Sequence, residues 1–274
     1  MKKILFFIIV ISVLSFIFVQ CDKTNISSKE NTESDSYDAY SKVMKIFREK
    51  GIKVVETPRK KIESRNNSSC YQNNTDSCLY VGYIYDTVYV PNVCSEAAVE
   101  YNLYWCENSG KLNITDFRAQ PLSPACDNIW DWWESLFTQG HYTEFSLSVD
   151  SFEYAASIPA EENIAYAFAV AYNRFCPNET FIANFHRQLC YQHCVKYLGK
   201  NKWPRFEIFK VGCGSKCCKR TREFCVNPDG STVLSYNHFE ELSGECNPNL
   251  TGFECNDGYL IGDCGRICGP PPTN

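Results

Sequence analysis

The pattern of apolar and polar positions divides the chain into an apolar leader, a polar segment and a body with regular periods. Apolar residues run almost without interruption over residues 4–19, behind two lysines. Residues 22–37 are rich in Ser, Asn, Lys and Glu and have almost nothing to bury. A segment of that composition stays extended and solvated. We therefore expect a flexible tether there and a folded body that begins near residue 39.

Apolar residues spaced three and four apart predict helices in three places. These are residues 39–50, 126–137 and 161–172. In the second, Trp130, Trp132 and Trp133 fall on one arc and the acidic residues on the opposite one. Such an arrangement predicts an amphipathic helix with its tryptophans turned inward.

Aromatic and β-branched residues dominate residues 78–106, which predicts strands. Residues 52–55 and much of the chain beyond residue 181 have the same character. The stretch 225–233 contains Asn-Pro-Asp-Gly, which is typical of a hairpin turn. We expect an α+β fold in which a mixed helix and strand segment precedes a β-rich, cysteine-dense segment.

These patterns predict four regions. They are a signal peptide (1–21), a polar tether with a short helix and strand (22–69), a mixed α/β segment (70–175) and a β-rich, cysteine-dense segment (176–274). The apolar leader is shorter than the ~20 residues that a membrane-spanning helix needs, so it indicates export. The expected location is extracellular or at the cell surface.

Two outcomes are open at the end of the leader. Cleavage after Cys21 would discard this cysteine, whereas cleavage before it would leave a lipidated N-terminal residue. The region partly resembles the signal of bacterial lipoproteins, although Gln20 stands where that signal has a small residue. Contact with a membrane is expected only through this possible lipid.

The cysteine content indicates a disulfide framework. The chain of 274 residues has 17 cysteines, and 16 remain when Cys21 is set aside. An even number suits an exported domain without a spare thiol. The expected structural disulfides use Cys70, Cys78, Cys94, Cys106, Cys126, Cys176, Cys190, Cys194, Cys213, Cys217, Cys218, Cys225, Cys246, Cys255, Cys264 and Cys268. Their pairing is open, except that adjacent Cys217 and Cys218 should each bridge elsewhere.

The spacing Cys213-x3-Cys217-Cys218-x6-Cys225, with its hairpin turn and an upstream Cys190-x3-Cys194, resembles a set of secreted cysteine-rich bacterial proteins of unknown function. The resemblance covers about residues 176–246 and implies no activity.

Charge is unevenly distributed. Residues 94–162 hold 12 acidic and 2 basic residues, whereas residues 196–222 hold 9 basic residues and one glutamate. The candidate ligand-binding residues in the basic stretch are Lys196, Lys200, Lys202, Trp203, Arg205, Lys219, Arg220 and Arg222. They would suit an anionic polysaccharide or an envelope component; alternatively, the two segments face each other. The chain as a whole is acidic, with a pI near 5.5, so general nucleic-acid binding is not expected.

The motifs of hydrolases and of phosphate-binding loops are missing from the sequence, and we expect no cofactor. Two chemical alternatives remain. Asp127, Asp131 and Glu134 beside the tryptophans could serve a secreted carbohydrate-active hydrolase. A zinc site could use His186, Cys190, His193 and Cys194 if they shared a helix, but disulfides are the expected use of these cysteines. The leading hypothesis is a non-catalytic binding or structural protein whose partner is unknown.

Overall fold

The computed structural model describes residues 40–55, 70, 78–122, 124–247, 255 and 257–271. The expected signal peptide, Cys21 and the polar segment 22–37 lie outside the described residues. The chain divides into two compact units, Met1–Ile46 and Phe47–Asn274. Residues 40–49 are helical, which confirms the first predicted helix.

The second unit contains strands and helices in a mixed order. In the described part of the chain they are β1 (Lys53–Val55), β2 (Leu79–Val90), β3 (Cys94–Cys106), the 3-10 turn Glu107–Ser109, β4 (Lys111–Pro121), α2 (Asp127–Thr138), α3 (Tyr142–Tyr172), β5 (Phe181–Gln188), β6 (Tyr191–Tyr197), β7 (Phe206–Gly212), β8 (Cys217–Val226), β9 (Thr232–Leu242) and β10 (Tyr259–Ile261). The protein is therefore an α+β protein, as predicted.

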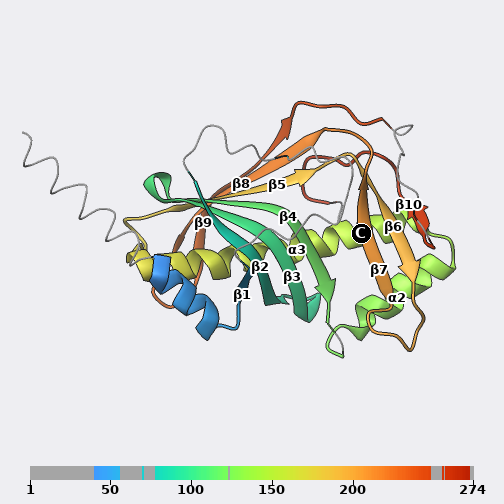
Figure 1. Ribbon diagram of the computed structural model, residues 1–274, viewed down its shortest axis with the longest axis horizontal. Coiled ribbons are helices and arrows are strands. Elements are labelled where there is room, and N and C mark those ends of the chain that lie inside the picture. Colours follow the sequence, from blue (N-terminus) through green and yellow to red (C-terminus); the bar gives the residue numbers. More distant parts are fainter. Residues whose placement is uncertain are drawn as a thin grey trace, which may run out of the picture. The chain divides into compact units, whose positions relative to one another are not determined.

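The strands form two sheets (Figure 1). The larger sheet has the order β1-β2-β3-β4-β5-β8-β9, and the smaller has the order β10-β6-β7. Neighbouring strands are antiparallel except for β4 and β5, which are parallel. Segment 70–175 supplies β2 to β4 and segment 176–274 supplies β5, β8 and β9, so both contribute to one sheet.

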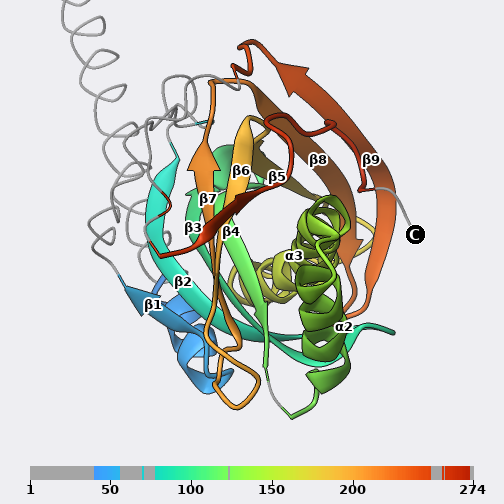
Figure 2. The ribbon, with the colours of Figure 1, turned by 90° about the vertical axis from the view of Figure 1, so that its right-hand side faces the viewer.

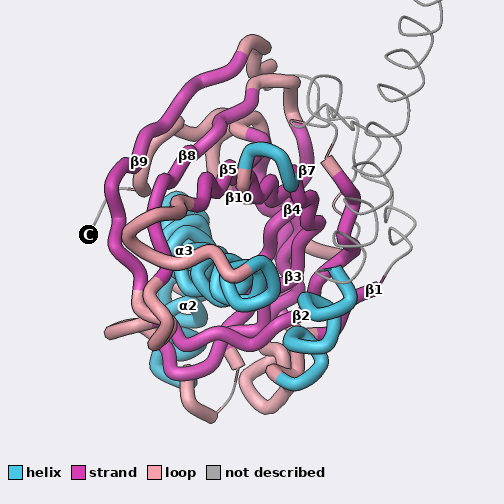
Figure 3. Tube along the Cα trace, turned by 90° about the vertical axis from the view of Figure 1, so that its left-hand side faces the viewer, coloured by secondary structure: helices cyan, strands magenta, loops and turns pink. Residues whose placement is uncertain are grey.

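Helix α3 lies inside the curve of the larger sheet (Figures 2 and 3). Trp105 of β3 packs on Phe168 of α3 with ring centroids 4.4 Å apart, and on Phe181 of β5 at 6.3 Å. The sequence predicted only residues 161–172 of this helix, which begins at Tyr142. Because strands surround α3, it buries residues on several faces, and the single apolar stripe that reveals a surface helix is lost.

Helix α2 confirms the prediction for residues 126–137. Trp130, Trp133 and Phe137 are buried on one stripe, but Trp132 is 44% exposed, so its predicted inward position is wrong. The reason is geometric: at ~100° per residue, Trp132 lies well outside the stripe on which positions 130, 133 and 137 fall. The buried stripe packs on the smaller sheet through Phe206, whose ring is 5.4 Å from that of Phe137.

All sixteen expected cysteines are paired, which confirms the predicted framework. The bridges are Cys70–Cys217, Cys78–Cys106, Cys94–Cys126, Cys176–Cys225, Cys190–Cys246, Cys194–Cys255, Cys213–Cys264 and Cys218–Cys268. Adjacent Cys217 and Cys218 bridge to distant partners, as expected. Four bridges join the described residues from Cys246 onward, which we call the C-terminal segment, to Cys190, Cys194, Cys213 and Cys218. Such dense bridging is typical of an oxidising, extracellular environment.

None of the helices in the described residues is long and apolar enough to cross a membrane.

Candidate ligand groove between the two sheets

A bulge in β4 separates this strand from β5. Residues Lys111–Thr115 of β4 pair with β5, but the pairing stops there. The register with β3 shifts between Glu100 and Asn102, and Asp116 takes a φ of 54°. Asn102 donates from Nδ2 to Asp116 Oδ2 at 2.8 Å. Since a bulge bends its strand, the second half of β4 leaves the plane of β5.

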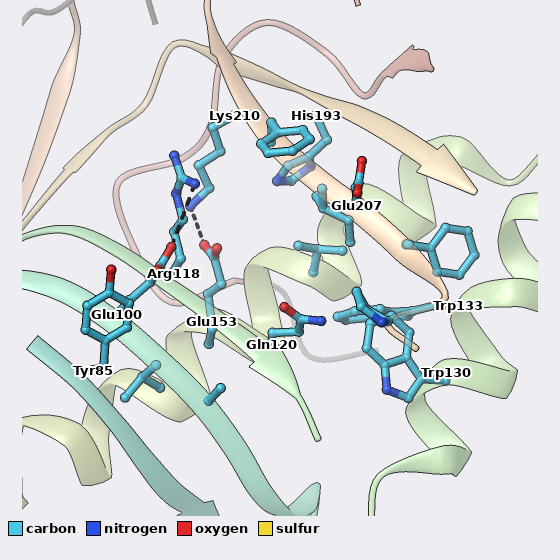
Figure 4. Close-up of a pocket in the computed structure, with 18 residues that line it drawn as sticks. Tyr85, Glu100, Arg118, Gln120, Trp130, Trp133, Glu153, His193, Glu207 and Lys210 are labelled. Atoms are coloured by element: carbon cyan, nitrogen blue, oxygen red, sulfur yellow. Dashed lines mark hydrogen bonds and ion pairs between the residues drawn. The ribbon is translucent and has the colours of Figure 1, made fainter. Parts of the chain in front are cut away.

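A cavity of about 350 Å³ is lined by residues of β4 in the larger sheet and of β7 in the smaller sheet, among others (Figure 4). It is lined by Tyr85, Ala98, Val99, Glu100, Arg118, Ala119, Gln120, Trp130, Trp133, Val149, Glu153, His193, Pro204, Phe206, Glu207, Ile208, Phe209 and Lys210. We call this cavity the inter-sheet groove. Its volume is at the lower end of the ~300–1,000 Å³ that is usual for small-ligand sites.

Two strand edges border the groove. Strand β7 is the outer strand of the smaller sheet and pairs only with β6 in the described part of the chain. Beyond Thr115, β4 pairs with β3 and with no other described strand. A free edge presents a row of backbone N–H and C=O groups that another chain can use.

Three buried ring nitrogens around the groove have no hydrogen-bond partner among the described residues. They are Nε1 of Trp130, Nε1 of Trp133 and Nε2 of His193. Buried polar atoms in native proteins are nearly always satisfied by protein, water or a ligand. These three nitrogens are shielded from solvent, so they lie behind the wall of the groove and not on its surface.

His193 is held by α3 and by the C-terminal segment. Its Nδ1 shares a hydrogen bond of 2.8 Å with Ser146 Oγ, which also receives a hydrogen bond of 2.6 Å from Arg266 Nη2. Its Nε2 is 3.6 Å from Asp150 Oδ1, beyond hydrogen-bonding distance. Burial lowers the pKa of His193 to about 4 against the opposing charge of Asp150. The imidazole is therefore neutral near pH 7.

Ser146, His193 and Asp150 are the residue types of a hydrolase triad, but their setting does not suit catalysis. Ser146 is 1% exposed and its oxygen is occupied by Arg266. Asp150 accepts hydrogen bonds from Tyr191 and Arg266. A nucleophile must reach its substrate, so the cluster connects α3, β6 and the C-terminal segment instead.

The charged residues of the groove are mostly compensated. Lys210 forms an ion pair with Glu153, and Arg118 lies 3.8 Å from Glu100 (Figure 4). Burial raises the pKa of Glu153, and the Lys210 charge opposes this shift. Glu207 is exposed and has no ion-pair or hydrogen-bond partner within the described residues. The groove thus has one carboxylate available to a ligand.

The predicted basic residues do not form one surface. Lys196, Lys200, Lys202, Trp203 and Arg205 lie on or after β6, in the smaller sheet and its hairpin, whereas Lys219, Arg220 and Arg222 lie on β8 of the larger sheet. Arg205 is buried against Asp131 and Glu134 of α2, and Arg220 and Arg222 are buried against Glu161 of α3. Lys219 lies 3.3 Å from Glu240. Exposed members of the set are Lys200, Lys202 and Trp203.

The proposed acidic site of the hydrolase alternative does not face the buried tryptophans. Arg205 donates to Asp131 at 2.5 Å and to Glu134 at 3.0 Å, and the hydrogen bond from Arg205 lowers the pKa of Asp131. Trp130 and Trp133 point into the core instead. The helix therefore follows the amphipathic pattern, with the acids on its outer side.

The zinc alternative is wrong. Cys190 is bonded to Cys246 and Cys194 to Cys255, so neither is a thiolate. His186 lies on β5 of one sheet and His193 on β6 of the other. Among the described residues, no group of three or more His, Cys, Asp or Glu side chains could hold a metal ion.

Sequence reasoning missed the groove, although one signal pointed toward it. Glu153 belongs to the acidic segment 94–162 and Lys210 to the basic segment 196–222, and the two face each other in the structure. The alternative expectation, that the acidic and basic segments face each other, therefore indicated one contact that lines the groove. Comparison of the chain with protein-family models, curated proteins and solved structures found no match.

Proposed function

We propose that this protein is an exported, disulfide-stapled binding protein that holds its ligand in the inter-sheet groove without chemical conversion. The supporting observation is the 350 Å³ cavity, which is bordered by edges of β4 and β7 that are unpaired within the described residues. Such edges present backbone N–H and C=O groups that can bond a ligand with its own donors and acceptors.

An anionic glycan or envelope component is a second candidate ligand. The exposed Lys200, Lys202 and Trp203 support it, since an aromatic ring beside lysines can contact a sugar and an acidic group together. The burial and pairing of Arg205, Arg220 and Arg222 leave this surface fewer available cations than the sequence predicts.

The test is a parallel screen of the full exported chain against a glycan array and a synthetic heptapeptide library. Ala119→Trp fills the groove, and Val233→Trp on the exposed strand β9 is the matched control. Binding that the first variant loses and the second retains, with the ligand recovered intact, supports the proposal. Binding that is unchanged in Ala119→Trp would contradict the groove as the binding site. Recovery of cleaved ligand would support the hydrolase alternative.

A further inference from the structure

We infer that the ligand is an extended polypeptide segment that adds as a strand to the free edge of β7 and directs a basic side chain to Glu207. This inference rests on the proposed function, because it names the ligand class for the same groove.

The free edges select a peptide over a sugar. Residues Phe206–Lys210 of β7 line the groove, and their strand has no partner on that side among the described residues. A strand edge presents donors and acceptors in a repeat of about 3.3 Å per residue, and an extended polypeptide offers the matching repeat. Peptide recognition by strand addition takes its affinity from these backbone bonds.

The other walls suit an added strand. The second half of β4 lies across the groove and also has an unpaired edge. Ile208 and Ala98 provide apolar surface, and the buried rings of Trp130 and Trp133 support the wall behind it. The five lining residues of β7 span roughly 17 Å, so a heptapeptide covers the groove.

Charge determines the side-chain preference. Arg118 and Lys210 are already compensated by Glu100 and Glu153, so the groove does not require an acidic ligand. Glu207 is the exposed lining carboxylate without a partner in the described residues, so a Lys or Arg of the peptide would complement it.

Strand β9 is the longest competing edge, since β1 and β10 also end their sheets but have three residues each. It ends the larger sheet, and its Val233 and Leu234 are 55% and 50% exposed. None of the residues that line the inter-sheet groove belongs to β9. The affinity of peptides that add to β9 would depend on β9 residues and would not change when the groove is filled.

The experiment selects heptapeptides on the immobilised full chain and measures the affinity of the best binder. Methylating its backbone nitrogens one at a time should weaken binding at alternate positions by about tenfold, because a strand bonds its neighbour through every second residue. Glu207→Lys should weaken a lysine-bearing peptide by about fivefold, and exchanging that lysine for glutamate should restore binding to the variant. Because Glu207 is exposed, this variant should fold even if Ala119→Trp does not.

The inference is overturned if no heptapeptide binds, if methylation acts without alternation, or if Val233→Trp abolishes binding while Ala119→Trp does not. If Ala119→Trp abolishes binding of a glycan, and no peptide shows such binding, the peptide ligand is overturned but the proposed function stands. Loss of groove-dependent binding for both libraries overturns both.

Discussion

Glu161 of α3 is fully buried and accepts hydrogen bonds from Arg220 and Arg222 of β8, the latter at 3.1 Å. Arg222 also donates to Glu162 at 2.9 Å. A buried carboxylate is stable only when such partners replace the water it has lost. This network therefore connects α3 to the larger sheet at the level of single side chains.

Glu161→Gln should lower the free energy of unfolding by about 3–5 kcal/mol, because it leaves the buried Arg220 guanidinium without its counter-charge. Arg222, by contrast, keeps Glu162. The control is Glu240→Gln, whose partner Lys219 lies in a largely exposed pair and should contribute below about 1 kcal/mol. Urea unfolding of both variants measures the difference. Equal losses of stability in the two variants would show that the buried network contributes no more than the exposed ion pair.

His193 should make stability depend on pH. Its pKa is about 4 in the folded protein and near 6.5 in an unfolded chain. The unfolded state then binds more protons between these values, so stability should fall as pH drops from 6.5 to 4, by up to about 1.4 kcal/mol per unit for this residue. His186 is shifted to about 4 as well and should add to the slope.

His193→Gln should remove part of this slope in urea unfolding at several pH values. Ser146→Ala is the matched control, because it removes the hydrogen bond to Nδ1 and keeps the imidazole. It should lower stability over the whole range and leave the pH slope. A slope that persists in His193→Gln would assign the dependence to other groups.

At the scale of elements, the contact between the β7–β8 connection and the C-terminal segment depends on glycine. Gly214 pairs with Cys246 through an isolated bridge and has a φ of +154°. A Cβ there would overlap the Glu245 carbonyl oxygen and lie 2.8 Å from Cys246 Cα. The main chains can approach this closely because position 214 has no side chain.

Gly214→Ala should therefore destabilise the protein more than Gly140→Ala. Both positions have positive φ, but a Cβ at Gly140 meets nothing within 4 Å. Strain alone should cost about 1–2 kcal/mol at Gly140, and the clash should add about 1–3 kcal/mol at Gly214. Thermal and urea unfolding would test this, and equal costs would refute the close approach.

Local patterns predicted some elements well and missed others for a physical reason. The Asn227–Gly230 turn and the buried stripe of α2 depend on neighbours in sequence, so both were predictable. The first half of α3 and the bulge at Asp116 were not, because burial on several sides and a register shift depend on packing and pairing with other strands.

At the scale of the whole molecule, the C-terminal segment is held by disulfides and by arginine side chains. Arg187 donates from Nη2 to the carbonyl oxygens of Ile267 and Gly269 at 2.9 and 2.8 Å. Arg266 donates to Asp150 at 2.8 Å. The segment thus completes the setting of His193 beside the inter-sheet groove.

Replacing Cys213 and Cys264 by Ala should cost about 2–4 kcal/mol and expose residues 257–271 to limited proteolysis. The matched control replaces Cys176 and Cys225, which close a loop of 49 residues against 51. The loop-entropy cost is nearly the same for both, but in the control the C-terminal segment should remain protected. Mass spectrometry of the fragments distinguishes the two, and equal cleavage would contradict a local role for Cys213–Cys264.

The sequence by itself determined the α+β class, the complete use of sixteen cysteines and the opposite charge of segments 94–162 and 196–222. Composition and short-range periodicity are enough for these. The tertiary structure decided which cysteines pair, that acids of α2 and α3 neutralise Arg205 and Arg220, and that β4 and β7 leave a groove between them. These features depend on contacts between residues tens of positions apart, and only the folded chain brings such residues together.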